Sequence, residues 1–102
     1  MIIRFRSSKL CRCYEQHREA QKAWGKPIAR KYVQAINLLR QVETASDLAA
    51  FRQFAYEPLR EDRKGQHSLR LGERARLIFT FSDSGQAVIA RIEEVDVRHY
   101  GH

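Results

Sequence analysis

The chain has 102 residues, of which 43% are hydrophobic and 30% charged, and its net charge is +7. These values fit a single domain over residues 1–102 with one modest core, and the arginine-rich charge favours a polyanionic partner such as nucleic acid, a membrane surface or an acidic protein. No stretch approaches the roughly 18 apolar residues of a membrane span, and the charged N-terminus is unlike a signal peptide, so we expect a cytoplasmic protein.

Cysteine usage argues against a secreted, disulfide-linked scaffold. Cys11 and Cys13 are the two cysteines, and they lie too close together in a helix to pair comfortably. His17 follows at a suitable spacing, but a zinc site needs a fourth ligand that the sequence does not offer. We therefore expect no metal and no small-molecule cofactor.

The N-terminal half predicts a short strand followed by a helical hairpin. Residues 2–6 have strand character, and Ser7 or Ser8 can cap a helix that Gly25 ends. On the apolar side of that helix, His17 is expected at the edge of the core. A second helix, starting near Pro27, carries an apolar stripe at helical spacing, formed by Ile28, Tyr32, Ala35, Ile36, Leu39 and Val42.

The C-terminal half predicts the sheet that this hairpin covers. Three alternating segments end near residues 71, 81 and 95, and they are separated by turns at Gly72-Glu73 and at Ser82 to Gly85. The expected class is α+β, with an N-terminal helical hairpin packed on a small, mainly antiparallel sheet.

Strand alternation predicts a group of arginines on the sheet face away from the helices. If the leucines and phenylalanines point to the core, then Arg70, Arg76 and Arg91 point outward. A bulge would move part of this set to the other face. One such arginine can be simply solvated, but three on adjacent strands favour an anion site.

RNA cleavage is one chemistry that this composition can support. The 2′-hydroxyl is the nucleophile, so the protein needs a base, cations for the phosphorane and an acid for the leaving oxygen. His67, His99 and Tyr100 are candidates for proton transfer, although the strand parity of His67 predicts partial burial. Glu57 is either a base or a surface carboxylate, depending on how its loop folds.

The loop before the first long strand carries further cations. Arg63 and Lys64 are either phosphate contacts or partners of Glu61 and Asp62.

The sequence resembles the HigB-type toxins of the RelE/ParE superfamily over essentially its whole length. The segment from Pro58 to Leu71 resembles their PLKGDRKGxWSIxV motif, and Ala75 to Phe79 resembles the WRIxF strand. The ending, from Arg91 through Tyr100, resembles members that finish in IEEVxxHYG.

This resemblance implies a RelE-like fold and the toxin of a type II toxin–antitoxin pair, which cuts mRNA on the ribosome and inhibits translation. Its partner would be a helix-turn-helix antitoxin. Arg76 matches the strand arginine that the family places near the scissile phosphate, and His99 and Tyr100 lie in its C-terminal catalytic region. Together with the candidates named above, the expected catalytic residues are Arg76, His67, His99 and Tyr100. The expected RNA contacts are Arg60, Arg63, Lys64, Arg70 and Arg91.

The sequence departs from the family pattern in four places. Glu57 replaces a histidine, Arg60 replaces a lysine, and Ala75 replaces an aromatic residue. The common ending is DYH, whereas this chain has His99-Tyr100 after a longer tail. Two alternatives stay open. One alternative is a ParE-like toxin that inhibits gyrase by binding. The other is a degenerate toxin that only binds its antitoxin or RNA.

Overall fold

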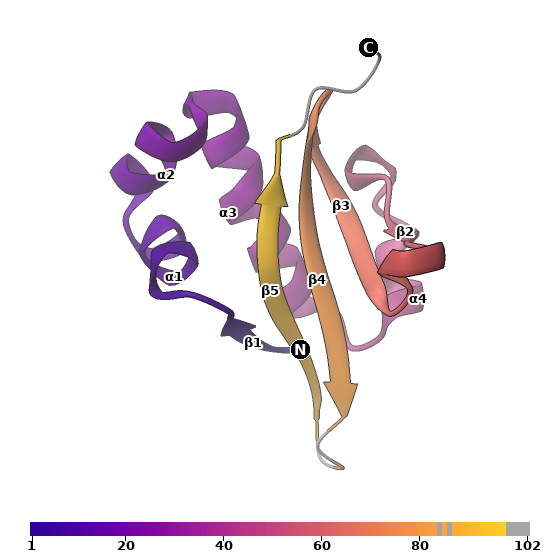
Figure 1. Cartoon of the computed structure of the whole chain (residues 1–102). Coiled ribbons are helices and arrows are strands. Elements are labelled where there is room, and N and C mark those ends of the chain that lie inside the picture. The colour runs from indigo at the N-terminus through magenta and orange to yellow at the C-terminus, as the bar shows by residue number, and fades with distance from the viewer. Residues whose placement is uncertain (84, 86, 98–102) are drawn as a thin grey trace.

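A computed structural model describes residues 1–83, 85 and 87–97 and has the expected α+β architecture (Figure 1). The strands are β1 (Ile2–Phe5), β2 (Glu57–Pro58), β3 (Gln66–Gly72), β4 (Ala75–Asp83) and β5 (Val88–Asp96). The α-helices are α1 (Ser8–Glu15), α2 (His17–Trp24), α3 (Lys26–Gln41) and α4 (Ala45–Leu48). Two 3₁₀ turns, η1 (Arg52–Phe54) and η2 (Glu61–Arg63), flank β2.

One five-stranded sheet, in the order β1-β5-β4-β3-β2, forms the centre of the molecule. β1 runs parallel to β5 and the other pairs are antiparallel, so the sheet is mainly antiparallel as predicted. α1, α2 and α3 lie on one side of the sheet, and we call the opposite side the open face (Figure 1). β1 precedes the helices and completes the sheet, so the helical hairpin is not the first element of the fold.

The predicted first helix is two helices, α1 and α2, which corrects the expected two-helix hairpin. Ser7 caps α1 by accepting a hydrogen bond from the Leu10 amide, at 3.2 Å. The break comes at Gln16, whose backbone is extended at φ −123° and ψ 99°. His17 therefore starts α2 and is exposed, so the prediction that it lies at the core edge was wrong.

α3 supplies most of the helical contribution to the core. Tyr32, Ile36 and Leu39 are fully buried, which confirms the predicted apolar stripe. The Tyr32 hydroxyl donates to the Leu10 carbonyl at 2.6 Å, and burial raises the pKa of Tyr32 above its usual range. α3 has 16 residues, and across the described ranges no helix is long and apolar enough to cross a membrane.

A bulge in β5 determines which side chains reach the open face. Ile78 pairs with Glu94, whereas Phe79 pairs with Ile92, so Glu93 is the extra residue. Before the bulge, Arg91 lies opposite Thr80 on the open face, as alternation predicted. Beyond it the phase changes, and the cross-strand partners place Glu94 and Asp96 on that face as well.

The loop before β3 is more ordered than the sequence suggested. Glu57 and Pro58 pair with Ser68 and His67, so β2 forms the edge of the sheet next to β3. Ala55 and Glu61 adopt left-handed backbone conformations on either side of β2, with φ 44° and φ 59°. These two turns direct the chain along the sheet edge and bring Arg63 over the open face.

Candidate active site on the open face

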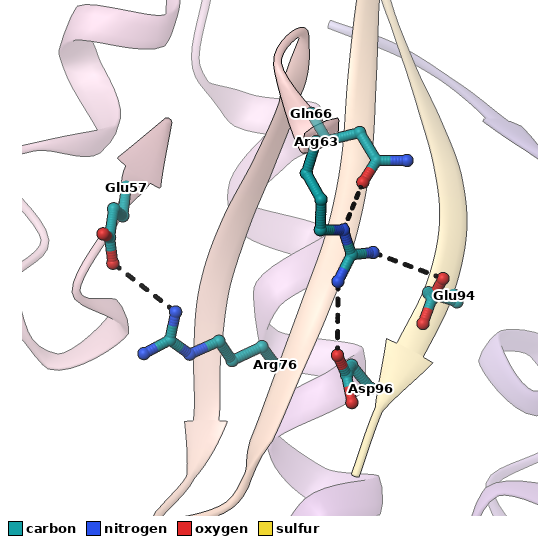
Figure 2. Close-up of polar contacts among 6 residues, drawn as sticks. All are labelled: Glu57, Arg63, Gln66, Arg76, Glu94 and Asp96. Carbon is teal, nitrogen blue, oxygen red and sulfur yellow. Dashed lines mark hydrogen bonds and ion pairs between the residues drawn. The ribbon is translucent and has the colours of Figure 1, made fainter. Parts of the chain in front are cut away.

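Arg76 and Glu57 form the centre of the candidate site (Figure 2). Arg76 projects from β4, and its Nη1 lies 3.5 Å from Oε2 of Glu57 on β2. β3 separates the two strands, so the pair spans one strand of the sheet. Both side chains are well exposed, at 41% for Arg76 and 59% for Glu57. A ligand on the open face can therefore reach a guanidinium and a carboxylate side by side.

Arg70 is the second cation at this end of the sheet. It is the direct cross-strand partner of Arg76, and it is exposed. Its Nε donates to the carbonyl of Gly72 at 3.3 Å, which directs the side chain toward the β3–β4 turn. Two adjacent arginines raise the local positive potential, and this favours an anion at the same place.

Arg63 lies near the same end of the open face but has other partners, one of which, Asp96, is the register partner of Arg76 (Figure 2). Its Nε donates to Oε1 of Gln66 at 2.8 Å. Its two terminal nitrogens each lie 3.4 Å from a carboxylate oxygen, one on Glu94 and one on Asp96. Arg63 therefore ties β3 to β5 across β4. The carboxylates it contacts come from the last strand, rather than from Glu61 and Asp62.

The two arginine–carboxylate groups differ in burial, and this difference determines which arginine can leave its carboxylate to bind a ligand. The exposed Arg76–Glu57 pair is worth about 1 kcal/mol at most, so a phosphate that Arg76 binds in bidentate fashion can displace the carboxylate. Asp96 is only 3% exposed, so removing Arg63 would take a close cation away from a buried charge. Arg63 therefore has a structural role in linking the strands, and its role as a phosphate contact stays a prediction.

The remaining predicted RNA contacts lie around this centre without forming one cluster. Arg60 and Lys64 are exposed at the two ends of η2. Arg91 is on the open face but nearer β1, with Nη1 3.9 Å from Glu93. The predicted convergence of Arg70, Arg76 and Arg91 is therefore partial, because Arg91 lies opposite Thr80 rather than opposite Arg76.

His67 lies on the helix-facing side of the sheet and not with Arg76. It pairs with Phe79 in the register, and its ring is 4.5 Å from that of Phe81. Its Nδ1 forms a 2.8 Å hydrogen bond with the Tyr56 hydroxyl. Burial lowers the pKa of His67 below its usual value, as the predicted partial burial requires. The sheet separates His67 from Arg76, so the two do not form one site on the open face.

Two predicted catalytic residues, His99 and Tyr100, lie outside the described residues, and their roles stay predictions.

Cys13 is buried and Cys11 is partly exposed, and desolvation raises the pKa of both thiols. Within residues 1–83, 85 and 87–97, no group of three or more His, Cys, Asp or Glu side chains is placed to hold a metal ion.

Three carboxylates on the open face were not assigned a partner from the sequence. The sequence alone does not decide whether Glu57 is a base or a surface residue, because it does not reveal that β2 pairs with β3. Glu94 and Asp96 were missed because the bulge changes the phase of β5. One signal was available: Glu93 and Glu94 are adjacent acidic residues in a strand, and alternation alone would point one of them into the core.

Comparison with known proteins establishes the fold. No protein-family model matches the chain, and no curated protein matches it in sequence. Solved structures do match. A YoeB/ParE toxin from Agrobacterium tumefaciens is 18% identical, with a TM-score of 0.61 over 97% of this chain and 100% of that one.

Two further structures match over nearly their whole lengths. In the YoeB–YefM complex from Staphylococcus aureus the matching chain is 21% identical, with a TM-score of 0.57 and 98% of both chains covered. YafQ from E. coli is 19% identical, with a TM-score of 0.59 over 94% of this chain and 91% of that one. The chain thus has the fold of these toxins, in agreement with the RelE-like fold that the resemblance implied. Assignment to the HigB branch stays a prediction.

Proposed function

We propose that the chain is the toxin of a type II toxin–antitoxin pair and that it cleaves mRNA on the ribosome. The observation that carries this proposal is the exposed Arg76–Glu57 pair, which places a cation and a carboxylate side by side on an open surface. The fold shared with YoeB and YafQ, and the motif resemblance over the C-terminal half, support the same function.

The proposed reaction uses the 2′-hydroxyl of the RNA as the nucleophile. The scissile phosphate binds Arg76 and Arg70, and this releases Glu57 from its ion pair. The Glu57 carboxylate then takes the proton of the 2′-hydroxyl while the 2′-oxygen forms a bond to phosphorus. The arginines stabilise the charge on the phosphorane. The bond from phosphorus to the 5′-oxygen breaks, and His99 or Tyr100 is the candidate that protonates this oxygen.

The proposed partner in the cell is an antitoxin that covers this basic chain. In Staphylococcus aureus, YoeB and YefM form a heterotetrameric toxin–antitoxin complex, and YoeB has the same fold as this chain. By analogy, an antitoxin would bind here and neutralise the toxin. A helix-turn-helix antitoxin is the kind that the sequence resemblance implies.

A gyrase-binding toxin is the second candidate, because the matching protein from Agrobacterium tumefaciens is described as a YoeB/ParE toxin. A gyrase inhibitor would act by surface binding and would not need the Arg76–Glu57 pair. The two candidates therefore differ in their dependence on these two side chains.

Primer extension on an mRNA in a purified translation system tests the proposal. Wild-type protein should produce cuts at ribosome-occupied codons, and Arg76→Ala should abolish them. Arg18→Ala, which removes an exposed arginine from α2 on the other side of the sheet, should cut normally. Intact mRNA with folded wild-type protein would refute the nuclease, and a DNA supercoiling assay with gyrase would then test the second candidate.

A further inference from the structure

A second group of arginines lies on the open face, away from Arg76. We call Arg4, Arg6 and Arg91 the distal cluster. Arg4 is the parallel register partner of Arg91, and the Arg6 amide donates to the Ile92 carbonyl just past the end of β1. All three are exposed. Alternation along β1 places Arg4 on the same face as its register partner Arg91.

One carboxylate, that of Glu93, organises the distal cluster. Its Oε1 is 3.9 Å from Nη1 of Arg6, and its Oε2 is 3.9 Å from Nη1 of Arg91. The Thr80 hydroxyl donates to Glu93 Oε2 at 3.0 Å, which fixes the carboxylate in place. Glu93 is only 10% exposed, so the arginines and not the acid face the solvent.

The charge balance of the distal cluster favours an anionic ligand. Arg6 and Arg91 share the Glu93 carboxylate, and Arg4 adds a third guanidinium to the cluster. Arg4 and Arg91 are also neighbours of like charge on adjacent strands, which is unfavourable. Side-chain exposure of 61% at Arg6 and 53% at Arg91 leaves both forks accessible. Arginine forks of this kind match the oxygens of a phosphate.

We propose that the distal cluster is a second phosphate subsite, which binds the backbone of single-stranded RNA a few nucleotides from the scissile phosphate. This proposal rests on the proposed nuclease function and extends it. Arg91 lies opposite Thr80, four residues along β4 from Arg76, so the two sites are roughly 13 Å apart along the strand. An RNA strand crossing the open face would contact Arg76 at one end and the distal cluster at the other.

The position of the cluster favours RNA over an acidic protein segment. Stable protein interfaces centre on apolar or aromatic anchors in pockets. A cavity of about 350 Å³ that Trp24 and Ile28 help to line lies beside α2 and α3, and not at the distal cluster. The distal cluster instead shares its face with the Arg76–Glu57 pair, which a single extended polyanion can reach.

Binding of a non-cleavable RNA tests this subsite without requiring catalysis. The probe is a fluorescent single-stranded octanucleotide with 2′-O-methyl groups, compared with the corresponding dinucleotide. In the Arg4→Ala/Arg91→Ala double variant, octanucleotide affinity should fall roughly tenfold, and the slope of log affinity against log salt should drop by about 1.4. Affinity for the dinucleotide, which is too short to reach both sites, should be unchanged.

Two matched variants separate a subsite from a folding defect. Arg18→Ala/Arg30→Ala removes the same charge from exposed positions on α2 and α3, and it should change octanucleotide binding by less than twofold. Glu93→Gln keeps an acceptor for Thr80 but removes the only carboxylate within 4 Å of these arginines among the described residues, so RNA should bind about threefold more tightly. A misfolded protein would not gain affinity.

Several results would overturn the subsite. These are an unchanged octanucleotide affinity and salt slope in the Arg4→Ala/Arg91→Ala variant, an equal loss in the helix-side control, or no RNA binding by the wild type. A poly-glutamate peptide serves as a second probe. If the Arg4→Ala/Arg91→Ala variant loses binding to this peptide but keeps RNA binding, the cluster is assigned to an acidic protein instead. Cluster-dependent RNA binding without mRNA cleavage would support the subsite and refute the nuclease.

Discussion

Arg76 on β4 and Glu57 on β2 meet across β3, with 3.5 Å between Nη1 and Oε2. This contact exists because β2, only two residues long, pairs with β3 and holds Glu57 opposite Ser68. The pair is exposed and therefore weak, whereas the neighbouring Arg63 is held by carboxylates that include the buried Asp96. The open face thus contains one arginine that a ligand can recruit and one that holds the strands together.

Replacing Glu57 with Gln should lower the single-turnover rate of mRNA cleavage by about 10²- to 10⁴-fold, because the base that takes the 2′-hydroxyl proton is lost. Binding of the mRNA–ribosome complex should be unchanged or slightly tighter, since a negative charge is removed beside the phosphate. Quench-flow cleavage and a separate binding titration measure the two effects. Glu73→Gln, at an exposed position in the β3–β4 turn, is the matched control.

Full cleavage activity in Glu57→Gln would show that Glu57 is not the base. A loss of ribosome binding equal to the loss of cleavage would indicate a binding role for the same residue.

Replacing Arg63 with Met should destabilise the fold by about 1–3 kcal/mol. The substitution keeps an unbranched apolar stem but removes the guanidinium beside Asp96, which is 3% exposed. Urea unfolding, followed by circular dichroism, measures the difference. Arg60→Met, at an exposed position on the same loop, should stay within about 0.5 kcal/mol of wild type.

An additional substitution checks that the carboxylate is the cause. In Arg63→Met/Asp96→Asn the buried negative charge is gone, so part of the lost stability should return. If the double variant is as unstable as the sum of the single variants, the pair does not act as a unit.

Much of the fold follows from short-range patterns in the sequence. The spacing of Tyr32, Ile36 and Leu39 predicts α3, and alternation in β4 predicts that Arg76 faces away from the core. The bulge at Glu93 could not be located in advance, because it depends on how β5 pairs with β4. For the same reason the sequence did not reveal that Arg63 contacts carboxylates 31 and 33 residues away.

Replacing Ala55 with Gly should stabilise the protein by about 0.5 kcal/mol. Ala55 has φ 44° and ψ 55°, a left-handed conformation that costs a residue with a side chain roughly 1 kcal/mol, and the greater freedom of glycine in the unfolded chain offsets part of the gain. Ala49→Gly is the control, because Ala49 has right-handed helical angles and the same change there should destabilise. Thermal unfolding of both variants decides the point, and equal destabilisation would contradict the prediction.

His67 should make the stability of the protein depend on pH below about 6.5. Burial lowers the pKa of His67 in the folded state, so the unfolded chain binds a proton first as the pH falls. The contribution of neutral His67 is therefore complete above the ordinary pKa of 6.5 and decreases as the pH drops toward the folded-state pKa. Urea unfolding of wild type and His67→Gln, from about pH 7.5 to about pH 5, should show the wild type losing stability relative to the variant.

The control is Tyr56→Phe, which removes the 2.8 Å hydrogen bond to His67 Nδ1 but leaves the His67 ring to titrate, so the pH dependence of stability should remain. Parallel curves for wild type and His67→Gln would show that the ring is not desolvated in solution.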